Sequence, residues 1–135
     1  MIKIKDLKQR LFYLGAVGIG IFLLFFVICC VWIGYDVKDQ CQTAQREYKG
    51  DCVESLISLL NDEGQGFRAR NSAIWALGQL GDSRALPVLQ TYYTGNIPDR
   101  EPLDKTISQY ELKKAVNLTG GGFNLSAPFW RFGIN

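Results

Sequence analysis

Hydrophobic residues gather near the start of this chain and are spaced out after it. Residues 11–35 form a run of 25 residues without a charged side chain, and the hundred residues that follow carry most of the ionisable groups. A helix of 25 residues is about 37 Å long, whereas the hydrocarbon core of a bilayer is about 30 Å thick. The pattern therefore predicts a single transmembrane helix over residues 11–35.

The ends of this run carry aromatic side chains, which favour the headgroup level of a bilayer: Phe12, Tyr13, Trp32 and Tyr35. One alternative is a removable signal peptide, but the apolar part of such peptides is only about 7–15 residues long, and no A-x-A-like cleavage site follows. The other alternative is a buried helix in the core of a soluble protein, which we disfavour because no polar face interrupts the apolar run.

Charge and cysteine placement predict the orientation of this span. Four basic residues precede it within residues 1–10, and the positive-inside rule then favours a cytoplasmic N-terminus: Lys3, Lys5, Lys8 and Arg10. Cys41 and Cys52 follow the span, and a disulfide between them would need an oxidising compartment. Two unrelated thiols are the alternative. We expect a protein of the plasma, inner or an organellar membrane, with its C-terminal part periplasmic, lumenal or extracellular.

Ala16 and Gly20 form a small-xxx-small pair within the predicted span. Small residues allow a second helix to approach closely in lipid, although glycine is common in transmembrane helices in any case. The pair is a candidate contact for a partner helix.

Beyond the span, apolar positions recur at helical spacing. Gly50 interrupts the polar stalk, Asp51 is a candidate N-cap, and Gly81 is a candidate C-cap. The predicted helical segments cover residues 36–50, 52–62, 66–81, 82–95 and 102–116.

The stretch FRARNSAIWALGQLGDSRALPVL resembles a HEAT-like repeat of the short type named from phycobilisome lyases. The resemblance covers residues 52–94, one repeat plus the second helix of a preceding one. It implies an all-α fold, in which the residues with structural roles are Arg68, Arg70, Ala73, Ala76, Leu77, Gly78, Gly81, Asp82, Leu86 and Leu89.

So short a repeat lacks neighbours, and about three repeats are usually needed for stability. We expect the stalk and the last helix to supply part of the missing burial, and a partner protein to supply more. The predicted organisation is a basic N-terminus (1–10), the transmembrane helix (11–35), a stalk helix (36–50), the HEAT-like repeat (51–94), a linker with a capping helix (95–119) and an extended tail rich in glycine and aromatic residues (120–135).

The tail is strongly apolar, and its only charged residue is Arg131. Exposed to water, such a segment would be prone to aggregate. It either folds back over the short repeat or inserts into a partner subunit or the membrane surface. Its apolar residues are Phe123, Leu125, Phe129, Trp130 and Phe132.

Composition argues against several classes of function. The chain has no histidine, which disfavours histidine-based catalysis and His-bearing metal sites, and its four cysteines form no paired CxxC motifs. Residues 36–135 hold 11 Lys and Arg against 12 Asp and Glu, a net charge of −1, which disfavours nucleic-acid binding. We expect no cofactor and no enzymatic activity. A bilin lyase-like enzyme and a thiol-redox protein using Cys41 and Cys52 are the enzymatic alternatives.

These observations predict an accessory subunit that docks onto a larger complex of integral membrane proteins and also contacts the lipid bilayer. A transient assembly factor or adaptor is the alternative. Trp75 would join the interaction surface only if it were exposed. The candidate partner-binding residues are Ala16, Gly20, Tyr92, Tyr93, Phe123, Phe129, Trp130 and Phe132.

Overall fold

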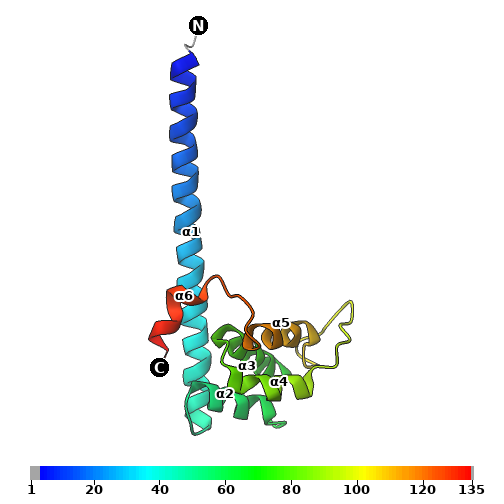
Figure 1. Ribbon diagram of the computed structural model, residues 1–135. Coiled ribbons are helices and arrows are strands. Elements are labelled where there is room, and N and C mark those ends of the chain that lie inside the picture. Colours follow the sequence, from blue (N-terminus) through cyan, green and yellow to red (C-terminus); the bar gives the residue numbers. More distant parts are fainter. Residues whose placement is uncertain (1–3, 135) are drawn as a thin grey trace.

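The computed structural model describes residues 4–134 and is all-α, which confirms the predicted fold class. Lys3, one of the predicted basic residues, lies outside the described range. One long helix carries a compact group of short helices at its C-terminal end (Figure 1). The elements are α1 (Ile4–Glu47), α2 (Cys52–Asn61), α3 (Phe67–Leu80), the 3-10 turn η1 (Ser83–Ala85), α4 (Leu86–Tyr92), α5 (Gln109–Thr119), α6 (Ala127–Trp130) and the 3-10 turn η2 (Arg131–Gly133).

The apolar run and the stalk form one continuous helix, α1, of 44 residues. By length and composition it is able to cross a membrane. Its side chains are exposed through most of the apolar run, and buried positions begin only near the end of that run. These positions recur every three or four residues and so form one face: Cys30, Gly34, Val37, Cys41 and Ala44.

A sharp reversal joins α1 to α2. Gly50 has a φ of 126°, a conformation that glycine adopts readily. The Asp51 carboxylate then accepts a hydrogen bond from the backbone N–H of Glu54, whose side chain bonds back to the Asp51 N–H. Cys41 and Cys52 are joined by a disulfide across this reversal, with their Cα atoms 4.9 Å apart. The stalk is thereby fixed to the first helix of the module.

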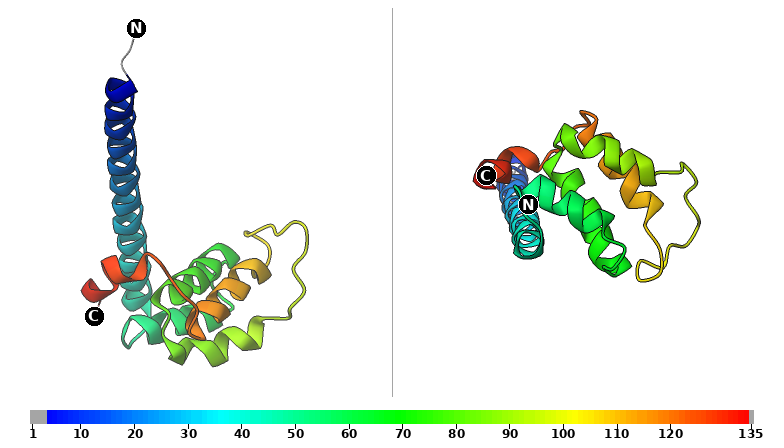
Figure 2. Two further views of the ribbon diagram at one scale, coloured as in Figure 1. Left: turned by 45° about the horizontal axis from the view of Figure 1, so that its top comes forward. Right: turned by 90° about the horizontal axis from the view of Figure 1, so that it is seen from below.

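Helices α2, α3, α4 and α5 pack to one side of the end of α1 (Figure 2). Gly81 ends α3 in the left-handed conformation, with a φ of 64°, and Asp82 caps the turn that follows by accepting from the N–H of Arg84. The core is filled by six fully buried side chains from four helices: Leu56, Leu60, Ile74, Leu77, Leu89 and Leu112.

The last helix of the module begins later than the periodicity predicts, at Gln109 rather than Pro102. The buried amide of Asn71 donates to the carbonyls of Leu103 and Thr106 and accepts from the Ser108 N–H. The Glu101 carboxylate accepts from the Ser108 hydroxyl. These long-range hydrogen bonds hold the segment as a loop and leave Ser108 as the N-cap of α5.

Helix α5 approaches α3 closely at Gly78. A Cβ on this glycine would lie 2.9 Å from the Cα of Ala115, which belongs to the backbone and cannot move aside alone. We expect Gly78→Val to lower the free energy of unfolding by about 1–3 kcal/mol through overpacking. Denaturation of the purified chain in detergent, followed by circular dichroism, measures the change. Gly133→Ala is the control, since its Cβ would meet nothing within 4 Å; equal stability of the two variants would contradict the close packing.

Candidate interaction surface

The C-terminal tail passes the repeat and returns to α1. After an extended stretch it forms α6, which packs against the end of the apolar run (Figure 1). The Trp130 side chain is 8% exposed and lies over Gly34, where a Cβ would sit 2.5 Å from the Cβ of Trp130. The rings of Phe129 and Phe26 meet edge to face, with centroids 5.4 Å apart. The tail therefore covers one face of α1.

Arg131 ties the same tail to the repeat. Its Nε and Nη2 atoms donate to the carbonyl oxygen of Gln79 at 3.0 and 2.6 Å. Gln79 lies in the last turn of α3, where carbonyl groups lack helical partners and attract cations. Burial lowers the pKa of Arg131. Asn124 adds a hydrogen bond to the Gln79 side chain at 2.9 Å, so the tail bridges α1 and α3.

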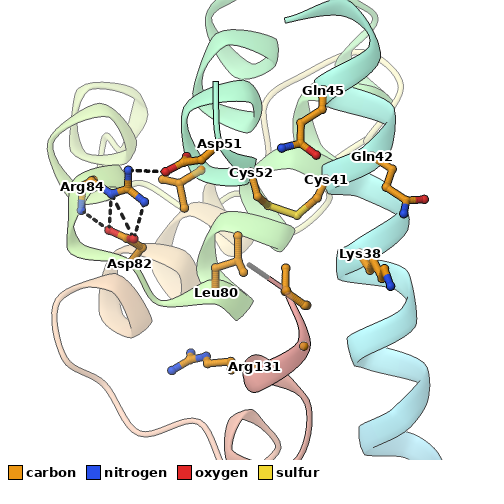
Figure 3. Close-up of a pocket in the computed structure, with 13 residues that line it drawn as sticks. Lys38, Cys41, Gln42, Gln45, Asp51, Cys52, Leu80, Asp82, Arg84 and Arg131 are labelled. Carbon is orange, nitrogen blue, oxygen red and sulfur yellow. Dashed lines mark hydrogen bonds and ion pairs between the residues drawn. A yellow bond between two sulfur atoms is a disulfide. The ribbon is translucent and has the colours of Figure 1, made fainter. Parts of the chain in front are cut away.

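A cavity of about 640 Å³ lies where the stalk, the repeat and the tail meet (Figure 3). On one side Arg84 bonds to Asp51 at 2.7 Å and to Asp82 at 2.9 Å. The hydrogen bond from Arg84 lowers the pKa of Asp82. The pKa of Asp51 is lowered first by the N–H of Glu54 and then by Arg84. The disulfide of Cys41 lines another side of the cavity.

The structure separates the sequence-predicted contact residues into exposed and packed groups. The exposed fractions of Phe123, Phe129 and Phe132 are 83%, 58% and 90%. Trp130, by contrast, is buried within the chain and packs against its core, and its role toward a partner stays a prediction. Ala16 and Gly20 are exposed on α1, closer to its N-terminus than Phe26, which contacts Phe129 of α6.

The tyrosines at the end of α4 are half-buried and pack against the core, as does Trp75. The Tyr92 hydroxyl donates to Asn61 at 2.9 Å, and the Arg70 guanidinium lies 5.7 Å from the centre of the Tyr92 ring. Tyr93 also packs against the core cluster. Both tyrosines therefore serve the packing of the module, and their role toward a partner stays a prediction.

Sequence reasoning missed the two residues that place the tail. In the sequence, Gly34 resembles any other glycine of an apolar helix, and Arg131 stands out only as the lone charge of the tail. Their partners, Trp130 and Gln79, are 96 and 52 residues away, beyond the reach of local periodicity. Within residues 4–134, no three His, Cys, Asp or Glu side chains lie close enough together to hold a metal ion.

The Arg84 cluster predicts a pH dependence of stability. The pKa of Asp82 lies below its ordinary value of 3.8. Its contribution to the free energy of unfolding is therefore fully present above the unfolded-state pKa, and it is lost as the pH falls through the lowered folded-state pKa. We expect Arg84→Ala to lower the melting temperature slightly near pH 7 and to flatten its fall below pH 5 or so. Arg68→Ala, at an exposed position on α3, should keep the parent profile; a parent-like profile in Arg84→Ala would refute the coupling.

The contact between Gly34 and Trp130 predicts a way to release the tail. Gly34→Val should displace Trp130, because the added methyl groups occupy the space of its side chain. We expect chymotrypsin to cleave within residues 129–132 about tenfold faster in detergent, which corresponds to about 1.4 kcal/mol. Gly20→Val is the matched control, since a Cβ there would meet nothing within 4 Å. Unchanged cleavage in Gly34→Val would show that this packing does not hold the tail.

Comparison with known proteins bears on the segment from α3 to α4. Residues 69–93 match the PBS lyase HEAT-like repeat family. Deoxyhypusine hydroxylase of Schizosaccharomyces pombe is 36% identical over 67 residues, which is 48% of this chain and 21% of the relative. The chain thus matches about a fifth of the length of that curated relative. No solved structure matches the chain.

These findings correct one expectation and confirm another. The expectation of no enzymatic activity is contradicted, because a relative that matches part of the chain is named as an enzyme. The resemblance stated from the sequence is confirmed, since the matched residues are the helix pair that carries the ALG-x-LGD turn. The chain therefore contains a HEAT-like repeat of the PBS lyase type, in a segment that includes residues 69–93.

Proposed function

We propose that the chain is a single-pass membrane subunit that holds a HEAT-like module against a larger complex of membrane proteins. The observation that carries the proposal is the rigid attachment of the module to α1. The disulfide, the packing of Trp130 on Gly34 and the hydrogen bonds of Arg131 to Gln79 all fix it in one place. A module held so firmly beside an apolar helix is suited to docking at a defined height above the membrane and at a defined angle to it.

The exposed apolar surface of α1 supports a membrane anchor. Most large apolar side chains of residues 11–28 are more than 40% exposed. Side chains such as Leu, Ile and Phe each favour insertion at the centre of a bilayer by about 0.3–0.6 kcal/mol. Water would penalise the same surface, whereas lipid or a partner helix would accept it.

The orientation is part of the same proposal. The basic residues of the N-terminal segment favour the cytoplasm. Cys41 and Cys52 lie beyond the other end of the span, on the C-terminal side, and a disulfide between them suits an oxidising compartment. The module then lies in the periplasm, a lumen or the cell exterior.

Partner contacts are proposed on two surfaces that the chain leaves open. One is the pair Ala16 and Gly20. A Cβ added at Gly20 would meet no atom within 4 Å, so this face of α1 is open. The other is the exposed aromatic side of the tail, which either a partner subunit or the membrane surface could cover. Integral membrane proteins are the partners that could reach Ala16 and Gly20.

We expect the tagged full chain to bring down a stoichiometric set of integral membrane proteins from native membranes in mild detergent. Gly20→Ile should reduce that recovery several-fold by preventing close helix contact. Gly18→Ile is the matched control, because residue 18 lies about 180° around the helix from the midpoint of Ala16 and Gly20.

Mass spectrometry of the captured proteins, normalised to the bait, measures the effect. Equal losses in both variants would argue against a contact at Ala16 and Gly20. An absence of partners with the unsubstituted chain would overturn the subunit proposal, and strongly substoichiometric partners would favour the transient adaptor.

A further inference from the structure

The tail has two sides with different chemistry. Ser126, Ala127 and Trp130 are buried, and the guanidinium of Arg131 is turned to α3. The other side consists of exposed apolar side chains: Phe123, Leu125, Phe129 and Phe132. Because Arg131 is the only charged residue in residues 123–132 and is already bonded to Gln79, the exposed side carries no charge.

The position of Phe129 along α1 shows the depth at which this apolar side lies. Its ring packs on Phe26, which is nine residues before Tyr35 and hence about 13 Å from it along the helix axis. A hydrocarbon core of about 30 Å spans about 20 residues. Even if that core started at Leu11, it would extend to Cys30 and include the level of Phe26.

Several polar groups of the tail are hydrogen-bonded within the chain, as a low-dielectric environment favours. The indole N–H of Trp130 donates to the Ser126 hydroxyl at 3.1 Å. The N–H of Phe129 donates to the carbonyl of Ser126 at 3.0 Å, and the N–H of Ser126 to the side chain of Asn124 at 3.1 Å. No buried side-chain nitrogen or oxygen within the described residues lacks a hydrogen-bond partner.

We propose that residues 123–132 form a lipid strap, an interfacial segment whose phenylalanines insert into the acyl chains of the leaflet on the module side. This inference rests on the proposed membrane span. The occupant is lipid because the Phe129 ring packs on Phe26 within the exposed apolar run of α1, and α6 lies beside α1 near the end of that run (Figure 1). Apolar rings on one face with polar groups turned inward are typical of segments that lie in the interface.

The lipid strap gives the module a second anchor beside α1. A single helix leaves the module free to rotate about its axis and to tilt. An insertion on one side of α1 restricts both motions, since Phe129 and Phe132 must stay in lipid. The module is then presented to a partner in one orientation.

Spin labels on the full chain in phosphatidylcholine vesicles test the lipid strap. The background Cys29→Ser and Cys30→Ala removes the free thiols and keeps the disulfide. Single cysteines replace Phe132 in the strap, Phe22 in the apolar run and Gln90 on α4, all exposed positions. We expect labels at 132 and 22 to collide several-fold more with oxygen, relative to an aqueous nickel chelate, than the label at 90. Phe123→Cys provides a second strap position if labelling at 132 disturbs the fold.

The outcomes separate the two proposals. Water-like labels at 132 and 123, with a lipid-exposed label at 22, would overturn the lipid strap and leave the membrane span standing. A water-like label at 22 would overturn the span itself. Labels at 132 that are water-exposed in vesicles but shielded from both reagents in native membranes would show that a protein partner, not lipid, covers the strap.

Discussion

The structure depends on one face of α1, because the helix that carries the exposed apolar run also packs against the helices of the module and forms one side of its core. Val37, Cys41 and Ala44 are buried against the repeat, and the apolar run ends only two residues before Val37 on the same helix. No flexible linker separates the two parts. Any constraint on the apolar run, such as a membrane under the proposed function, is therefore passed directly to the module.

The second constraint closes the chain on itself. Apart from α6, the main contacts of the module with α1 come from α2 and α3, near the C-terminal end of α1. Trp130 adds a contact at Gly34, and Arg131 joins that contact to the C-terminal end of α3. The stalk, the repeat and the tail are then each in contact with the other two, and these contacts resist bending at the stalk more than a single junction would.

Local patterns were enough to predict the features that depend on nearby residues. The apolar run, the cap at Asp51 and the left-handed Gly81 follow from side-chain type and spacing within one turn. The start of α5 could not be predicted in this way, because Asn71 and Glu101 hold the preceding loop through side-chain hydrogen bonds. The path of the tail depends on Gly34, a residue whose importance is visible only once Trp130 lies beside it.

The short repeat also shows how a fragment of a solenoid can bury its ends. In a long array, each helix pair is covered by the next. Here α1 covers α2 on one side, and α5 covers α3 and α4 on the other, with Leu112 fully buried in the shared core. The chain thus supplies caps for its own repeat. Under the proposed function, a docking partner would meet surfaces that are already folded.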